Sequence, residues 1–285
     1  MGLETNRSKP LKYLLLWILL FRLIIPAAHA AEADNTLVFG FLPVLSTHKL
    51  ISRFKPLVDY LSKTLGQPIR METARNYAAF LRRTRQQRYD ILFTAPHFYY
   101  LANRENGYQS IVRVGAPKLK AILVATRASQ ITQLTQLKGK KIATPDPLSL
   151  CTALIRNLLR SAGLDPDIDV TLVSTPSHNA ALLTAFNGTT EAASLMIPPY
   201  QRATEDIRNA MLTLGVTKGV TNMPIAVSAS LSQDKIDKIA KSLLSLHKTK
   251  EGQALLKHLS WPMGFARASN AEYASLKTIA QDIKF

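Results

Sequence analysis

The chain has 285 residues, enough for one large domain or two modest ones, and 47% of them are hydrophobic while 19% are charged. This composition excludes a disordered chain, a collagen-like repeat, a coiled coil and a low-complexity tract. The single cysteine excludes an intramolecular disulfide framework and any multi-cysteine zinc or iron–sulfur site. The formal net charge of +17 is high enough to make nucleic acid a candidate partner.

Residues 1–30 have the order of a secretory signal peptide. Basic residues precede the apolar stretch Tyr13–Ile25, which is followed by Pro26 and the triplet Ala28–Ala30. We therefore predict cleavage after Ala30 and a periplasmic protein. The apolar stretch is shorter than the about 20 residues of a membrane-spanning helix, and a retained anchor is the alternative. An exported protein meets no cytoplasmic nucleic acid, so the positive charge either steers a small anion or forms a generally basic surface.

The first part of the mature chain alternates short apolar runs with amphipathic segments. We predict helices at Lys49–Leu65, Tyr77–Arg85 and His97–Glu105, because apolar residues recur there at helical spacing. The strands predicted between them are Leu37–Leu42, Ile69–Glu72, Tyr89–Thr94 and Ile111–Val114.

A second series follows the same alternation and ends in a helical tail. Its predicted strands are Leu119–Thr126, Lys140–Thr144, Val170–Ser174, Glu191–Ile197 and a return strand near Ile225–Ser228. Its predicted helices are Leu148–Ala162, Asn179–Phe186, Gln233–His247, Thr249–Leu259 and Asn270–Ile283.

This order predicts an α/β fold of two lobes, each a parallel-rich sheet flanked by helices. We assign residues 31–117 and 225–285 to the first lobe and 118–224 to the second, with extended segments crossing between them. Ligands of open α/β sheets bind at the carboxyl ends of the strands, so we expect a ligand cleft between the lobes.

No catalytic signature is present in the sequence. It lacks a nucleophile elbow, a P-loop, a dinucleotide-binding glycine motif and the H-E-x-x-H motif, and its six histidines show no metal-ligand spacing. We therefore expect no enzyme, no metal and no cofactor.

The candidate binding residues lie in turns between strands and helices. In the turn that ends at Ser149, backbone N–H groups at the start of the next helix favour an anion, and Ser149, Cys151 and Thr152 would add side-chain contacts. The alternative is that Asp146 or Ser149 only caps this helix. His178 begins another helix and either donates to an anion or belongs to the cap region.

Two further features leave alternatives open. The aromatic residues of the segment Thr94–Tyr100 either belong to the core or line a ligand site. Cys151 is either a small buried hydrophobic residue or a low-pKa thiol that binds a soft species.

A series of short segments runs through nearly all of the mature chain: Gly40–Pro43, Phe54–Leu61, Leu65-Gly66, Ala74–Tyr77, Tyr89–Ile91, Ala95-Pro96, Leu137–Lys141, Asp146–Ser149, Ser177–Leu182 and Gly188–Ala193. Their order and spacing resemble the phosphate, phosphite and phosphonate-binding proteins of ABC transporters, which have the type II periplasmic binding fold. The resemblance implies a receptor that clamps an oxyanion between two lobes and delivers it to a membrane permease.

By position, the resemblance also implies the roles of individual residues. Tyr77 would wall the cleft, Ser149 and Cys151 would lie at the anion-binding helix terminus, and His178 would donate across the cleft. Thr94 falls at a position that often faces the ligand in this family.

This chain departs from the family at the anion loop. It has Leu150, Cys151 and Thr152 where phosphonate-binding members have threonine, serine and glycine, so two hydroxyl donors are missing. Met223 stands where receptors for amine-bearing phosphonates have an acid, which disfavours an aminoalkyl phosphonate. The primary prediction is a monomeric receptor of an ABC importer for a small oxyanion. The alternative is a ligand-sensing co-receptor of a membrane histidine kinase.

Overall fold

The computed structural model describes residues 1–2, 35–281 and 283. The predicted signal peptide, residues 1–30, therefore lies outside the described residues except for its first two. Residues Thr36–Phe285 form one compact unit that contains every helix and strand described below.

Two mixed sheets form the framework of this unit. The six-stranded sheet has the order β11-β4-β10-β3-β1-β2, and the five-stranded sheet has the order β7-β6-β8-β5-β9. The strands of the first sheet are β1 (Leu37–Phe41), β2 (Ile69–Glu72), β3 (Ile91–Phe93), β4 (Gln109–Val114), β10 (Pro224–Val227) and β11 (Phe265–Arg267). Those of the second are β5 (Ala121–Thr126), β6 (Lys141–Thr144), β7 (Thr171–Ser174), β8 (Ala192–Met196) and β9 (Met211–Val216).

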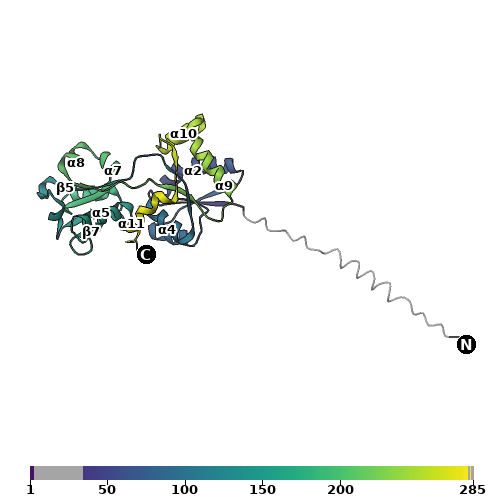
Figure 1. The fold of residues 1–285 in the computed structure, drawn as a ribbon, viewed down its shortest axis with the longest axis horizontal. Helices are drawn as coiled ribbons and strands as arrows, with labels where there is room; N and C mark the ends of the chain where they lie inside the picture. Colours follow the sequence, from purple (N-terminus) through teal and green to yellow (C-terminus); the bar gives the residue numbers. More distant parts are fainter. Residues whose placement is uncertain (3–34, 282, 284–285) are drawn as a thin grey trace. The chain divides into compact units, whose positions relative to one another are not determined.

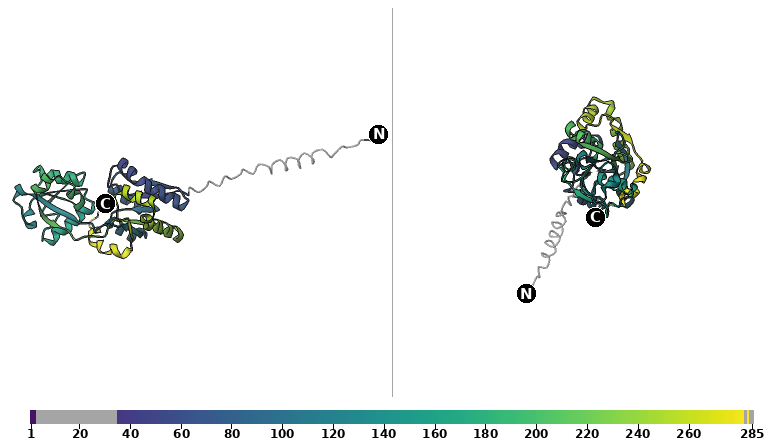
Figure 2. Two further views of the ribbon diagram at one scale, coloured as in Figure 1. Left: turned by 90° about the horizontal axis from the view of Figure 1, so that it is seen from above. Right: turned by 90° about the vertical axis from the view of Figure 1, so that its left-hand side faces the viewer.

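Helices flank both sheets. They are α2 (Thr47–Leu65), α3 (Tyr77–Arg85), α4 (Pro96–Asn106), α5 (Leu150–Ser161), α6 (His178–Phe186), α7 (Ile197–Gln201), α8 (Glu205–Ala210), α9 (Gln233–Ser245), α10 (Lys250–Leu259) and α11 (Lys277–Ala280). In Figure 1 the teal and green elements around the five-stranded sheet form one lobe, and the purple and yellow-green ends of the unit join in the other. The view from above shows the same grouping (Figure 2).

The fold class predicted from the sequence is confirmed. β1 pairs in parallel with β2 and β3, and β6 pairs in parallel with β7 and β8. The antiparallel pairings are those of β10 with β3 and β4, of β11 with β4, and of β5 with β8 and β9.

Two extended segments connect the sheets, one between β4 and β5 and the other between β9 and β10. They meet where Leu119 and Val220 exchange backbone hydrogen bonds of 2.8 and 2.9 Å. This small antiparallel bridge joins the two connections to each other between the sheets.

Most predicted elements are found, and α2 shows why. Leu50, Phe54, Leu57 and Leu61 recur on one buried face of this helix, and Gly66, at φ 62°, ends it in the left-handed conformation that glycine adopts without steric cost. Among the described residues, the strands β9 and β11, the helices α7 and α8, and the 3₁₀ helices Arg127–Ser129 and Leu134–Leu137 have no counterpart in the sequence-based prediction.

The predicted terminal helix Asn270–Ile283 is wrong in its detail. Residues Asn270–Leu276 form a 3₁₀ helix, and only Lys277–Ala280 are α-helical. The buried residues Tyr273, Leu276 and Ile279 are spaced by three, which is the repeat of a 3₁₀ helix and not of an α-helix.

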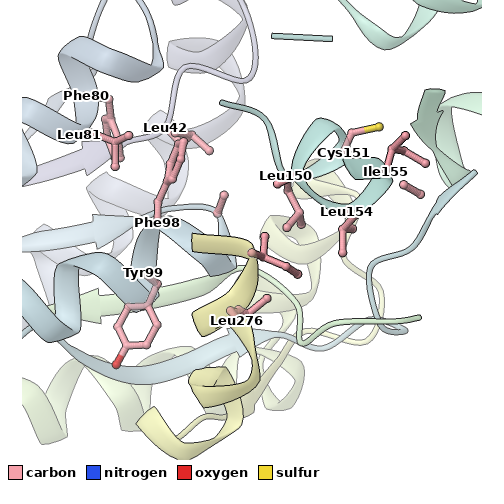
Figure 3. Packing of buried hydrophobic residues seen from close by; sticks show 14 of the residues in the cluster. Leu42, Phe80, Leu81, Phe98, Tyr99, Leu150, Cys151, Leu154, Ile155 and Leu276 are labelled. Carbon is pink, nitrogen blue, oxygen red and sulfur yellow. The ribbon is translucent and has the colours of Figure 1, made fainter. Parts of the chain in front are cut away.

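One hydrophobic cluster includes residues from both lobes (Figure 3). Phe98 and Tyr99 of α4 belong to it on one side, Leu150 and Leu154 of α5 belong to it on the other, and Leu276 joins it from the C-terminal segment. The start of α5, where the sequence predicts an anion site, is therefore built on a core that both lobes share.

Candidate binding site at the start of α5

The carboxyl ends of three parallel strands meet at one edge of the five-stranded sheet. Thr144 at the end of β6 is in register with Ser174 at the end of β7, and β8 runs beside β6. Helices α5, α6 and α7 follow these strand ends. The turns that the sequence singled out at Ser149 and His178 therefore lie at the same edge.

Ser149 caps α5. Its Oγ accepts a hydrogen bond of 3.2 Å from the Thr152 N–H and lies 3.0 Å from the Thr152 Oγ1. The Asp146 carboxylate accepts a bond of 2.8 Å from the Leu148 N–H, which tightens the turn before the helix. The capping interpretation is thus confirmed for Ser149, whose hydroxyl is already engaged within the turn.

The first turn of α5 still offers backbone donors. The N–H groups of its first two residues, Leu150 and Cys151, have no intrahelical acceptor, and the positive end of the helix dipole lies there. Thr152 is buried, and its Oγ1 lies 3.0 Å from the Asp146 carbonyl oxygen, to which it donates. The turn therefore presents backbone N–H groups to an anion more readily than the hydroxyl groups predicted from the sequence.

The Cys151 side chain points into the core. It is 1% exposed, and its Sγ lies 3.8 Å from the Ser194 Oγ. Burial raises the pKa of the thiol to about 12, although the hydrogen bond to Ser194 acts in the opposite direction. The hypothesis of a low-pKa thiol is therefore wrong, because desolvation outweighs the helix N-terminus.

His178 is the first residue of α6, after the N-cap Ser177. Its Nδ1 accepts a hydrogen bond of 3.4 Å from the Met196 N–H, which leaves the proton on Nε2. Burial, with a smaller contribution from the charge of Arg202, lowers the pKa of His178 to about 4. At neutral pH the imidazole is thus an uncharged donor that points away from Met196.

A residue from the lobe of the six-stranded sheet, Tyr77, also lies near the turn before α5. It begins α3, whose N-cap Asn76 accepts a bond from the Ala79 N–H, and its ring packs edge-on against Phe98 with centroids 5.8 Å apart. Burial raises the pKa of its hydroxyl to about 12, and the proximity of Asp146 and Cys151 adds to the effect. Tyr77, which belongs to the lobe of the six-stranded sheet, therefore lies close to the start of α5 in the other lobe.

Thr94 lies in the turn between β3 and α4, His97 lies in the first turn of α4, and both are fully buried. The Thr94 Oγ1 has no hydrogen-bond partner among the described residues. The His97 Nε2 lies 3.0 Å from the Leu148 carbonyl oxygen, so His97 contacts the same turn as Tyr77. Sequence reasoning treated His97 only as part of an aromatic segment, and no local signal distinguished it.

Burial also sets the charge state of His97. It lowers the pKa of the imidazole to about 4, and the hydrogen bond to Leu148 only partly opposes this. The structure thus gathers Tyr77, His97, Ser149 and Thr152 around the turn before α5, with His178 at the neighbouring helix start. The Thr94 hydroxyl makes no hydrogen bond to these groups or to any other described residue.

The described residues give no sign of a metal centre or a membrane span. No group of three or more histidine, cysteine, aspartate or glutamate side chains in residues 35–281 is arranged to hold a metal ion. Within the same part of the chain, none of the helices is both long and apolar enough to cross a bilayer.

Known proteins share both the sequence pattern and the fold. Residues 39–273 match a family described as the periplasmic substrate-binding protein of phosphonate ABC transporters. The phosphonates-binding periplasmic protein of Escherichia coli strain K12 is 22% identical over 275 residues, which cover 90% of this chain and 79% of that protein.

Solved structures agree with the fold. PhnD1 of Prochlorococcus marinus in complex with methylphosphonate superposes with a TM-score of 0.74 at 16% identity, covering 87% of this chain and 98% of that one. A binding component of a Pseudomonas aeruginosa phosphonate ABC transporter gives a TM-score of 0.71 at 17% identity, covering 86% and 85%. Nothing in these similarities supports the sensing alternative. Because the family match extends over most of its length, the chain belongs to the family of periplasmic substrate-binding proteins of phosphonate ABC transporters.

Proposed function

We propose that this protein is an exported receptor that binds a small phosphonate or related phosphorus oxyanion between its two lobes and presents it to the membrane permease of an ABC importer. The observation that carries the proposal is the start of α5, where the unpaired N–H groups of Leu150 and Cys151 lie near Tyr77 of the other lobe. Family membership supplies the transport context.

Each proposed site residue has a distinct role. The helix terminus holds the phosphoryl oxygens through backbone N–H groups, and Ser149 and Thr152 fix the turn that aims them. His178 donates through Nε2–H, and Tyr77 closes over the ligand from the other lobe. The neutral imidazole and the helix dipole suit an anion without a full counter-charge.

Thr94 and Cys151 each contribute a single group to the proposed site. Cys151 contributes its backbone N–H and not its thiol, because the side chain faces Ser194. The unpartnered Thr94 hydroxyl turns toward the ligand when the lobes close. An anion that contacts both lobes has a higher affinity for the closed form and so shifts the population toward it.

The remaining assignments belong to the same proposal. The signal peptide, residues 1–30, is removed on export, and the mature protein acts as a monomer. The first lobe comprises residues 31–117 and 225–285 and the second comprises 118–224, with a hinge at the bridge between Leu119 and Val220.

The test is calorimetric and thermal-shift titration with methylphosphonate, phosphite, phosphate and sulfate. A ligand at 100 times its Kd adds about 2.7 kcal/mol to the free energy of unfolding, a shift of several degrees in Tm for a protein of this size. Ser149→Ala and His178→Ala are expected to weaken binding about tenfold or more. Thr249→Ala, which removes the matching N-cap of the distant α10, is the control and leaves affinity unchanged. Absence of binding to any phosphorus oxyanion would refute the proposal.

A further inference from the structure

A cavity of about 390 Å³ lies beside the first two turns of α5. Its lining includes Leu148 in the turn before the helix and Thr152 in the first turn. These two residues flank Ser149, Leu150 and Cys151, where the proposed function places the phosphoryl group. The volume is in the range of about 300–1,000 Å³ that is typical of small-molecule sites. The cavity therefore adjoins the proposed anion site.

The face of α5 that lines the cavity differs from the face that lies in the core. Thr152 and Arg156 both line the cavity, and residues four apart lie on the same side of a helix. Leu150 and Leu154 point instead toward the core that both lobes share (Figure 3). The cavity thus lies outside the shared core, on a neighbouring face of the helix.

The other wall of the cavity is the end of the five-stranded sheet. Thr144 and Ser174 are in register at the ends of β6 and β7, and both line the cavity together with Leu172. Leu172 and Ser174 are two residues apart in β7, so they lie on one face of the sheet. Ile283, which follows α11, also contributes to the lining. The cavity therefore has apolar walls, formed by Leu148, Leu172 and Ile283, at the strand ends where open α/β sheets bind ligands.

The charges of the lining cancel. Among the described residues that line the cavity, only Arg156 and Asp167 are charged, and an Arg156 Nη donates to the Asp167 carboxylate over 2.5 Å. An ammonium or carboxylate group that entered the cavity would lose water without meeting a net opposite charge. The lining therefore favours an uncharged group.

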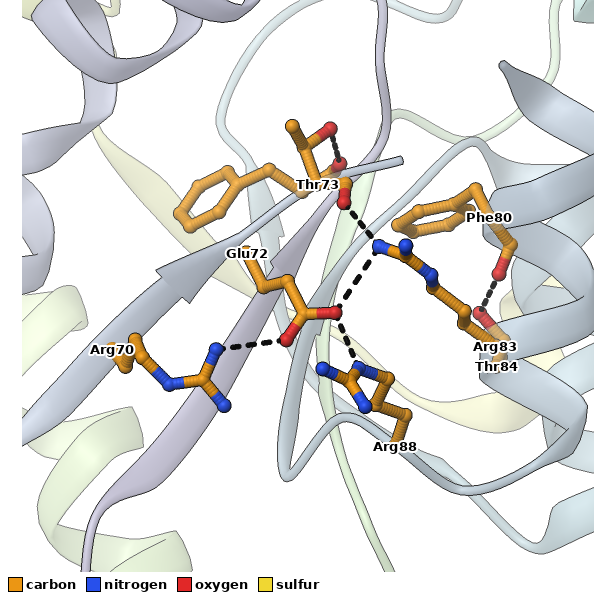
Figure 4. A network of polar contacts seen from close by, with 8 residues as sticks. Arg70, Glu72, Thr73, Phe80, Arg83, Thr84 and Arg88 are labelled. Atoms are coloured by element: carbon orange, nitrogen blue, oxygen red, sulfur yellow. Dashed lines mark hydrogen bonds and ion pairs between the residues drawn. The ribbon is translucent and has the colours of Figure 1, made fainter. Parts of the chain in front are cut away.

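Another cluster of charged residues in the same chain shows the contrast. Arg70, Arg83 and Arg88 converge on the single carboxylate of Glu72, with N–O distances of 3.0 Å for Arg70 and 3.2 Å for Arg83 (Figure 4). Three guanidinium groups share one carboxylate there, so that surface keeps a positive charge, which suits the steering of an anion. The one-to-one ion pair in the cavity leaves no such excess.

We propose that this cavity holds the organic substituent of a phosphonate whose phosphoryl group lies at the start of α5. This inference rests on the proposed function and adds the substrate class, a phosphonate whose substituent is uncharged and larger than a methyl group. Contacts with Leu148, Leu172 and Ile283 supply the affinity, because each methylene group that leaves water on binding strengthens it about fourfold.

The experiment compares the Kd values of four phosphonates by calorimetry. The wild-type protein is expected to bind butylphosphonate about tenfold or more tightly than methylphosphonate, because the longer chain fills the cavity. Propylphosphonate and 2-aminoethylphosphonate have nearly the same size. The uncharged propyl compound is expected to bind about tenfold more tightly, because no ammonium group has to be desolvated.

Two substitutions test the lining. Leu172→Trp fills part of the cavity and is expected to weaken butylphosphonate binding about fivefold or more while leaving methylphosphonate nearly unchanged. Leu214→Trp is the matched control and is expected to change neither, since Leu214 is also half-buried but lies in β9, at the opposite edge of the same sheet from β7. Asp167→Asn removes the more exposed member of the ion pair and leaves Arg156 available to a carboxylate. This variant is expected to bind 3-phosphonopropionate about fivefold or more tightly than the wild type does.

Thermal unfolding of each variant separates an effect on the cavity from loss of the fold. Equal wild-type affinity for methylphosphonate and butylphosphonate, or equal losses in the two tryptophan variants, would overturn the role of the cavity while leaving the receptor function intact. Tighter binding of 2-aminoethylphosphonate than of propylphosphonate would overturn the uncharged class. Failure of all these phosphonates to bind would overturn the receptor function and the inference together.

Discussion

His97 and Leu148 join the two lobes through one hydrogen bond, in which the His97 Nε2–H donates to the Leu148 carbonyl oxygen over 3.0 Å. His97 lies in the first turn of α4, and Leu148 lies in the turn before α5. The contact therefore holds the turn before α5 from the opposite lobe, through a fully buried His97.

Replacement of His97 by phenylalanine is expected to lower the free energy of unfolding by about 1–3 kcal/mol, because the half-buried Leu148 carbonyl loses the donor that the fully buried His97 supplies, while the ring volume is roughly kept. Urea denaturation measures this loss. His258→Phe is a matched control, since the His258 Nε2 also lies 3.0 Å from a carbonyl oxygen, that of Ser52, but at an exposed position. A similar cost for both variants would contradict the importance of burial.

The stability of the protein is expected to fall as the pH is lowered from about 6.5 to about 4. Burial lowers the pKa of His97 and His178 from 6.5 to about 4 in the folded state, so the unfolded chain binds more protons in this window. The contribution of His97 reaches about 3 kcal/mol when the window has been crossed. Thermal unfolding at a series of pH values measures it. The dependence should flatten in His97→Phe and persist in His48→Gln, which changes an exposed histidine.

Cys151 is expected to resist thiol reagents in the folded protein. Its Sγ is buried against Ser194, and the high pKa of the thiol keeps the thiolate population very small at neutral pH. Modification by an aromatic disulfide reagent should therefore proceed only as fast as the chain opens, and it should accelerate in urea. Rapid stoichiometric labelling without denaturant would show that the thiol is accessible.

Gly40→Ala is expected to destabilise the fold by about 1–3 kcal/mol or more, because a Cβ at Gly40 would lie 2.4–2.7 Å from the ring carbons of Tyr89. The Tyr89 ring is fully buried and packs against Phe80 with centroids 5.3 Å apart, so it cannot move aside. Differential scanning calorimetry measures the cost. In a Tyr89→Leu background, which removes the ring, the same glycine substitution should cost clearly less, and strict additivity would argue against the clash.

The sequence predicted an element correctly where that element contains its own apolar repeat and its own terminating residue. The buried face of α2 and its terminal Gly66 are both local features, and the predicted helix Lys49–Leu65 differs from the observed Thr47–Leu65 only at its start. The edge strands β9 and β11 were missed because their partners, β5 and β4, are remote in sequence and supply the pairing. Such strands are defined by tertiary contacts and not by their own composition.

The chemistry of the candidate site could be predicted from the sequence, but the orientation of its side chains could not. The cap at Ser149 follows from residue type and position, whereas the inward orientation of Cys151 depends on which face of α5 meets the core. The contact between His97 and Leu148 depends on how α4 and the turn before α5 approach from different sheets, which no local pattern encodes.

Strand β10 is synthesised long after β3 and β4, the strands with which it pairs, and this order has a consequence for folding. This strand fills the position between β3 and β4, although more than a hundred residues separate it from both along the chain. The six-stranded sheet therefore stays open until residue 227 has been synthesised, and the shared core also waits for Leu276 and Ile279. The six-stranded sheet and the shared core of a nascent chain are therefore completed only when nearly all of the chain is available, whereas the strands of the five-stranded sheet are all present by residue 216.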